Sequence, residues 1–215
     1  THPGSGNWSG TLANALLHYN PSLESLDRAG IVHRLDKNTS GLMVVAKNQK
    51  SQKYLVEQLQ SHSISREYSA IVYGHMISGG TISEPLGRDP KDRVKQAVLR
   101  NGREATTHYR VINRFKSHTH VKAILETGRT HQIRVHLSHI GHSLVGDSIY
   151  GGKVRYPKKA SEDLKNELFN FRRQALHSKK LTLKHPKSGE LLSWKLPLPD
   201  DMLKLLEVLT EFDKN

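Results

Sequence analysis

Residues 33–41 read His-Arg-Leu-Asp-Lys-Asn-Thr-Ser-Gly, a short extended run that ends in a carboxylate and passes directly into a dense turn signal. The flanking runs Gly30–Leu35 and Leu42–Lys47 have the pattern of strands, so the turn is predicted to join them. Side chains alternate along a strand, which would place Arg34 on the same side as Asp36. With cationic neighbours the Asp36 carboxylate would stay ionised, as a nucleophile or a base requires. The alternative is a turn aspartate that caps local N–H groups.

Outward from this segment, short strands outnumber helices and do not alternate with them strictly, which predicts the α+β class. Six further strands are predicted, at Glu67–Gly74, Val94–Leu99, Ala105–Phe115, His120–Glu126, Ala175–Leu183 and Leu191–Leu196. Apolar residues recur at helical spacing in three segments, Ser51–Ser61, Thr130–Ile140 and Asp201–Phe212. Hairpins and meanders joined to separate helices are therefore expected.

A second chemical segment opens the strand at Glu67–Gly74. Tyr68 lies among polar neighbours there and follows Arg66 by two residues. Such a tyrosine could stack on a nucleobase or use its hydroxyl as a hydrogen-bonding group. The alternative is an ordinary strand aromatic that fills the core.

A third segment, residues 126–136, runs from a strand end through a glycine turn into a helix start. Thr130 is predicted to cap this helix, whose exposed N–H groups and the nearby Arg129 suit a phosphate. Arg134, one turn further, would project toward a carboxylate delivered from elsewhere in the chain.

The composition excludes several classes of protein. The chain has 33 Lys and Arg, 20 Asp and Glu, a formal charge of +13 and no cysteine, so disulfides and cysteine-ligated zinc are excluded. No apolar run approaches the ~20 residues that cross a bilayer, and none has the pattern of a secretory h-region. We expect a cytoplasmic protein without a membrane partner, and the charge predicts a polyanion, with nucleic acid favoured over an anionic membrane.

The positive charge is concentrated in two blocks. Residues 88–116 hold nine basic and three acidic residues, a net of +6, and residues 153–187 hold eleven against three, a net of +8. Any single block could be a solvated face. Two separated blocks favour a track for a phosphate backbone.

Fourteen histidines raise the question of a metal site. His131, His136, His139 and His142 are spaced by 5, 3 and 3 residues, without a His-Glu-x-x-His motif or a nearby acidic residue. Solvated or phosphate-contacting histidines are the better interpretation, and we expect no metal. The glycine pairs match neither a P-loop nor a dinucleotide fingerprint, so no nucleotide cofactor is expected.

The three chemical segments together resemble a known family. Residues 33–41 are similar to the signature of the RluA-type pseudouridine synthases at every characteristic position, and residues 66–68, 128–136 and 144–152 follow in the family's order. The resemblance covers essentially the whole chain. It implies the pseudouridine synthase fold, a mainly antiparallel mixed β-sheet with flanking helices and loops around a central RNA-binding cleft. One departure is Ser143, where the family pattern has proline.

The resemblance also implies an activity and residue roles. The family isomerises uridine to pseudouridine in RNA, with Asp36 matching the essential aspartate, Tyr68 the tyrosine that stacks on the target base, and Arg134 the basic partner of the aspartate. Arg34 would lie beside the cavity that the target nucleotide vacates. The other matched positions expected to contact RNA are His33, Thr39, Arg66, Arg129, Thr130 and His131. Asp36 could attack C1′ or remove the C2′ proton, and the sequence does not choose.

Similarity at both ends of the chain points to the bacterial branch that modifies 23S ribosomal RNA, at the stem-loop of the intersubunit bridge. The expected partner is therefore 23S rRNA or a large-subunit precursor particle, bound by a monomer without a cofactor. We interpret residues 1–215 as one catalytic domain. Because the chain starts at Thr1 and this branch carries an upstream S4 RNA-binding module, we expect a fragment that lacks that module.

Three alternatives remain. A synthase of the same family could act on tRNA or on other rRNA sites. A non-catalytic RNA-binding or assembly protein would need the charge but not the grouping of Asp36, Tyr68 and Arg134. A histidine-based RNA hydrolase is disfavoured, because the chain has no paired His-x-Thr or His-x-Ser repeat.

Overall fold

The computed structural model describes residues 8–214, so the family similarity at the start of the chain, His-Pro-Gly-Ser-Gly-Asn at residues 2–7, lies outside the described residues. The chain divides into two compact units. Unit 1 comprises Thr1–Leu35, Leu42–Ser65 and Leu181–Trp194, and unit 2 comprises Asp36–Gly41, Arg66–Lys180 and Lys195–Asn215. Within the described residues, no helix has the length and apolarity that crossing a bilayer requires.

In the part of unit 1 that the structure describes, there are two α-helices and two 3-10 helices. Their bounds are α1 Leu12–Tyr19, η1 Pro21–Ser25, η2 Asp27–Gly30 and α2 Gln49–Gln60. Thr11 and Asn14 form a capping box at the start of α1, and Asn48 caps α2 through the Ser51 N–H. The apolar stripe of α2 packs around Leu55 against Leu181 and Leu183.

The predicted hairpin of Gly30–Leu35 and Leu42–Lys47 is wrong. Only one antiparallel bridge, between Ile31 and Val45, joins the two runs. The Val44 N–H is donated instead to Nε2 of His33, at 2.9 Å. A side chain therefore takes the place of a ladder hydrogen bond, and the chain continues as an ordered loop.

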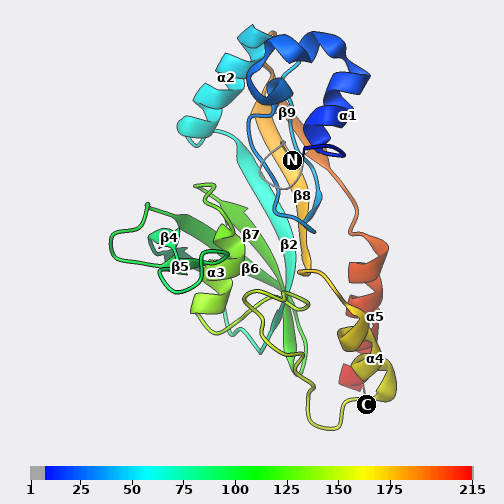
Figure 1. Ribbon diagram of the computed structural model, residues 1–215. Coiled ribbons are helices and arrows are strands. Elements are labelled where there is room, and N and C mark those ends of the chain that lie inside the picture. Colours follow the sequence, from blue (N-terminus) through cyan, green and yellow to red (C-terminus); the bar gives the residue numbers. More distant parts are fainter. Residues whose placement is uncertain (1–7, 215) are drawn as a thin grey trace. The chain divides into compact units, whose positions relative to one another are not determined.

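A seven-stranded mixed sheet has the order β1-β8-β2-β7-β6-β3, with β9 paired to β8 (Figure 1). Its strands are β1 Ser40–Gly41, β2 Ser65–Tyr73, β3 Gly80–Ser83, β6 Thr106–Arg114, β7 His118–Leu125, β8 Leu176–Lys184 and β9 Leu191–Lys195. A separate hairpin joins β4 Leu86–Arg88 to β5 Gln96–Val98. The β2–β7, β7–β6 and β6–β3 pairs are antiparallel, whereas β1 runs parallel to β8. The mainly antiparallel mixed sheet and the six outer strand predictions are confirmed.

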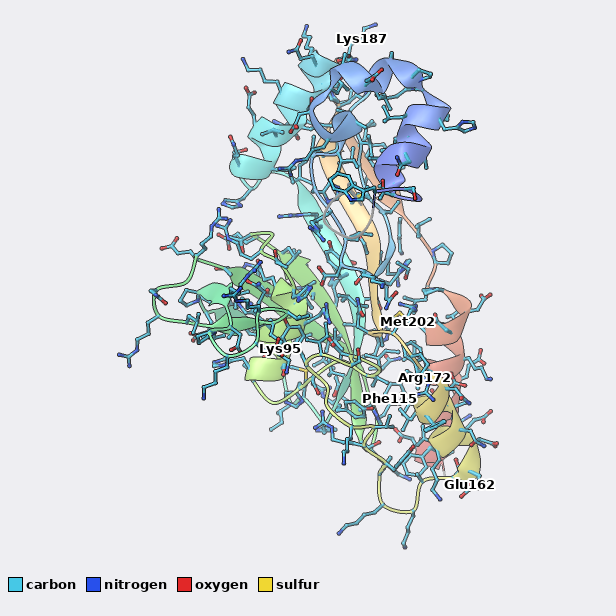
Figure 2. The ribbon with its side chains drawn as sticks, in the orientation of Figure 1. Lys95, Phe115, Glu162, Arg172, Lys187 and Met202 are labelled. Carbon is cyan, nitrogen blue, oxygen red and sulfur yellow. The ribbon has the colours of Figure 1, made fainter. Side chains whose placement is uncertain are left out.

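Helices α4 Glu162–Asn170 and α5 Asp200–Lys214 lie side by side in unit 2 (Figure 1). Their apolar faces join one core cluster with Ile71 and Phe115, and Figure 2 labels Phe115 and Met202 of this cluster. Met202, Leu205 and Leu209 are fully buried, which confirms the predicted apolar stripe of α5. The third predicted helix is α3, Gln132–His139.

Candidate active site

Arg134 of α3 lies between two carboxylates. Its Nε and Nη2 donate to Asp147 Oδ2 and Oδ1 at 2.7 and 2.9 Å, and its Nη1 donates to Asp36 Oδ2 at 3.3 Å. The Arg134 side chain is 4% exposed, the Asp147 side chain 0% and the Asp36 side chain 18%. The predicted meeting of Asp36 with Arg134 is therefore present, and Asp147 is an additional member.

Asp147 is the partner that fixes the guanidinium. Its Oδ1 also accepts the N–H groups of Ile149 and Tyr150, at 3.0 and 3.1 Å. Burial acts to raise the pKa of Asp147, but the hydrogen bonds and charge of Arg134 outweigh it and the pKa is lowered. Burial likewise opposes the charge of Arg134, and the two carboxylates reverse this, so the pKa of Arg134 is raised. Both pKa shifts favour the charged forms of Asp147 and Arg134.

Tyr150 supports Arg134 from another side. The Arg134 guanidinium carbon lies 4.9 Å from the centre of the Tyr150 ring. The Tyr150 hydroxyl accepts the Gln96 N–H at 2.8 Å and shares a 2.8 Å hydrogen bond with His131 Nδ1. Sequence reasoning matched residues 144–152 to a family pattern but gave Asp147 and Tyr150 no role. The available signal in the sequence was that Asp147 is the only acidic residue between Glu126 and Glu162.

The turn that carries Asp36 is held by β8 and by Gln174, which lies two residues before that strand. Gln174 Nε2 donates to the Lys37 carbonyl at 2.7 Å and to the Thr39 hydroxyl at 2.8 Å. Gly41 has φ +115°, and a Cβ at that position would lie 2.2 Å from the Ser178 carbonyl oxygen. Only glycine fits this approach of β1 to β8. The hydrogen bond from Gln174 to the Thr39 hydroxyl gives Thr39 a structural role in this turn.

Tyr68 is buried on β2, within electrostatic range of Asp36. Burial raises the pKa of its hydroxyl, the charge of Arg66 and a hydrogen bond with the Ser178 side chain act against that rise, and the charge of Asp36 adds to it. The hydroxyl is therefore kept protonated and neutral.

Arg66 is a buried cation beside Tyr68. Burial lowers its pKa, and within the described residues its Nε has no hydrogen-bond partner. Its Nη2 donates to the Glu126 carbonyl at 3.4 Å. A Cβ on Gly128 would lie 2.5 Å from its Nη1, so the glycine leaves room for the guanidinium.

The start of α3 differs from the prediction. The residue before the helix is His131 in the left-handed conformation, without a side-chain cap, so the predicted Thr130 cap is wrong and Thr130 is exposed. Gln132 satisfies the turn instead, because its Oε1 accepts the Arg129 N–H at 2.9 Å and the Thr127 hydroxyl at 2.7 Å. The Arg129 Nε donates to the Glu104 carbonyl.

The predicted site residues are divided between the two units. Unit 1 contains His33 and Arg34, and unit 2 contains the others: Asp36, Thr39, Arg66, Tyr68, Arg129, Thr130, His131 and Arg134. His33 accepts the Val44 N–H, and Arg34 is exposed. Between residues 8 and 214, no three His, Asp or Glu side chains form a group that could hold a metal ion.

The unit 2 arrangement can perform chemistry on an organic substrate. A carboxylate that retains some exposure faces a buried guanidinium, and a neutral tyrosine lies within its electrostatic range. This combination suits a nucleophile or a base whose negative charge is stabilised by a fixed cation.

Sequence comparison defines the class of protein. The family model for RNA pseudouridylate synthases matches residues 5–139, and the chain belongs to this family. Among solved structures, human RNA pseudouridylate synthase domain containing 4 superposes with a TM-score of 0.67 at 28% identity, covering 84% of this chain and 75% of that one. The predicted family and the pseudouridine synthase fold are confirmed.

Individual relatives are more similar still. The chain is 55% identical over 208 residues to ribosomal large subunit pseudouridine synthase D of Escherichia coli (strain K12), covering 97% of this chain and 64% of that protein. It is 54% identical over 210 residues to the protein of the same name from Pseudomonas aeruginosa, covering 98% and 66%. The chain thus spans just under two thirds of the length of these relatives.

Proposed function

We propose that this chain is an RNA pseudouridine synthase that isomerises uridines of large-subunit ribosomal RNA, with residues 1–215 acting as one catalytic domain. The observation that carries the proposal is the contact of Asp36 with the Arg134–Asp147 pair in a chain of this family. The ribosomal substrate is supported by the names of the relatives above, whereas tRNA or another rRNA site is the alternative. We further propose that the protein acts as a monomer in the cytoplasm, where ribosomes are assembled in bacteria.

The reaction breaks the N1–C1′ bond of uridine and forms a C5–C1′ bond, with loss of the C5 proton to solvent and gain of a proton at N1. It is an isomerisation without net redox change. Asp36 acts at the sugar in one of two ways. It attacks C1′ and is displaced by C5 of the turned base, or it removes the C2′ proton to give a glycal-like intermediate and returns the proton when C5 adds.

The other residues hold the substrate. The target base must leave its stack, at a cost of a few kcal/mol, before Asp36 can reach the sugar. We assign Tyr68 to stacking on the base and Arg134 to stabilising charge on Asp36. We assign contacts with RNA to His33, Arg34, Thr39, Arg66, Arg129, Thr130 and His131.

Release of tritium from uridine C5 tests the proposal. We expect label to pass into water when the chain acts on 23S rRNA transcripts carrying [5-³H]uridine, and Asp36→Asn to slow this release by at least about 10³-fold, since it removes the reacting group but not the pocket. A tRNA transcript serves as the comparison substrate. Undiminished release by Asp36→Asn would remove Asp36 from the mechanism. RNA binding without release from any transcript would favour a non-catalytic binding protein, and chain cleavage a hydrolase.

A further inference from the structure

The loop Gly151–Ala160 begins directly after Tyr150, whose ring lies against Arg134, and ends where α4 begins (Figure 1). It contains four basic residues, Lys153, Arg155, Lys158 and Lys159, and no acidic residue. Lys153 is three residues from Tyr150, which corresponds to no more than about 11 Å of backbone. A basic segment of ten residues therefore follows the candidate active site directly in the chain.

The loop lacks regular secondary structure but is fixed at several points. The Gly151 N–H donates to the Asp147 carbonyl at 2.8 Å, and Ala160 is buried in the core cluster of α4 and α5. Val154 packs against the same cluster. Each fixed point reduces the conformational entropy that the loop would lose on binding a ligand.

Arg155 supplies a further fixed point. Its guanidinium carbon lies 4.3 Å from the centre of the Tyr73 ring, and its Nη2 donates to the Ser143 hydroxyl. The Tyr73 ring in turn lies against His118, with ring centres 5.1 Å apart. Arg155 therefore holds the loop against β2, and its guanidinium is occupied by contacts with Tyr73 and Ser143 within the protein.

The three lysines are used differently. Lys153, Lys158 and Lys159 are exposed, and among the described residues no acid forms an ion pair with any of them. By contrast, Lys165 of α4 and Lys204 of α5 lie within 2.6 and 3.2 Å of glutamate oxygens. Three like charges on one pinned loop repel one another unless a polyanion neutralises them.

Tyr156 adds an aromatic surface to these charges. It is 47% exposed and lies between Arg155 and Pro157 in the chain. Cationic groups combined with an exposed aromatic ring are the pattern of surfaces that bind unpaired nucleic acid strands.

We propose that the loop Gly151–Ala160 binds the RNA strand beside the target uridine, with Lys153, Lys158 and Lys159 on its phosphates and Tyr156 stacked on an unpaired base. The inference rests on the proposed function for the identity of the RNA and adds a binding surface beyond the site residues given there. Arg155 is a positioning residue in this surface.

The test measures binding of a fluorescently labelled stem-loop RNA with unpaired flanking nucleotides across a KCl series. The combined variant Lys153→Ala, Lys158→Ala, Lys159→Ala is expected to lower the affinity and to reduce the slope of log K against log [KCl] by about 2, because each phosphate contact on a single strand contributes about 0.7. Tyr156→Ala is expected to weaken binding about tenfold without changing the slope, as loss of one stacked base would.

A matched control removes the same number of charges elsewhere. Lys165→Ala, Lys204→Ala, Lys214→Ala acts on α4 and α5, where two of the three lysines are paired with glutamates, and is expected to keep the wild-type slope. A wild-type slope in the loop variant overturns the proposal, and so does an equal loss in the control. Unfolding midpoints of both variants confirm that each is folded.

RNA binding can be measured without turnover. The proposed synthase activity and the proposed RNA-binding loop can therefore be refuted independently of each other. A chain that loses salt dependence with the loop lysines but releases no tritium from any RNA refutes the proposed function alone. A chain that releases tritium while the loop variant keeps its slope refutes the loop alone.

Discussion

At the scale of single residues, Asp36 and Asp147 bind the same guanidinium with different consequences. Asp147 is completely buried and accepts hydrogen bonds from Arg134 and two backbone N–H groups, whereas Asp36 is 18% exposed and makes one longer bond to Arg134. Asp147→Asn leaves a buried cation short of one counter-charge and is expected to cost about 3–5 kcal/mol of unfolding free energy. Asp36→Asn is expected to cost no more than about 1 kcal/mol. Urea titration of both isosteric variants gives the two values, and equal losses would contradict the proposed division of roles.

The same residues mark how far sequence reasoning reaches at this scale. Asp36, Tyr68 and Arg134 were predicted from motif chemistry, and the structure places the first and third in contact. Asp147 was missed because its importance depends on its four hydrogen bonds, and its sequence neighbours Gly146 and Ser148 are those of an ordinary turn. The Thr130 cap failed because Gln132, a residue not expected in that role, reached back to the turn.

At the scale of elements, the short strand β1 connects the Asp36 turn to the sheet. Gly41→Ala would place a Cβ 2.2 Å from the Ser178 carbonyl oxygen, so β1 must move away from β8 and shift the turn. We expect tritium release to fall about 10²-fold, since a displacement near 1 Å of a reacting group has that effect. Gly189→Ala is the control, because Gly189 also has positive φ but nothing within 4 Å of its Cβ position. Activity retained by Gly41→Ala would show that the turn is not held through β1.

Element prediction succeeded where periodicity is strong and failed where tertiary contacts decide. The alternating pattern of β6 and the apolar stripe of α5 were sufficient to predict both. The run Gly30–Leu35 has strand composition, yet the His33 ring takes the Val44 N–H and the ladder does not form. The two-residue β1 carries no periodicity, so its parallel pairing with β8 is visible only in the fold.

At the scale of the whole molecule, the charge of +13 is not one uniform surface. Within the basic block at residues 153–187, Arg173 is bound to both oxygens of Asp201, and Arg172 lies over the Phe169 ring near α4 (Figure 2). These arginines stabilise the fold, whereas the lysines of residues 151–160 are exposed without ion pairs among the described residues. Composition predicted the polyanionic partner, but separating structural cations from free ones required the contacts.

Two buried histidines of β7 are expected to make the whole fold sensitive to acid. Burial lowers the pKa of His118 to about 4, assisted by the charge of Arg155, and burial with the charge of Lys179 does the same for His120. A folded-state pKa below the unfolded value of 6.5 gives stability that is present above pH 6.5 and is lost as the pH falls toward 4. Each histidine is expected to remove about 2 kcal/mol of unfolding free energy between about pH 7 and about pH 5. Asp147 and Asp201, whose pKa values are lowered, stay ionised in this window and do not contribute to the loss.

Urea unfolding at a series of pH values checks this expectation. A packing defect lowers the unfolding free energy equally at every pH, whereas titration of a histidine changes how steeply the unfolding free energy falls with pH. His118→Gln keeps a neutral polar side chain and is expected to remove about 2 kcal/mol of the loss between the two pH values, even if its stability at about pH 7 is lower. His75→Gln, at an exposed position, is expected to leave the pH dependence as in the wild type. A His118→Gln chain with the full wild-type loss would show that this histidine accepts its proton without unfolding, and the acid sensitivity would then have to originate in other groups, His120 among them.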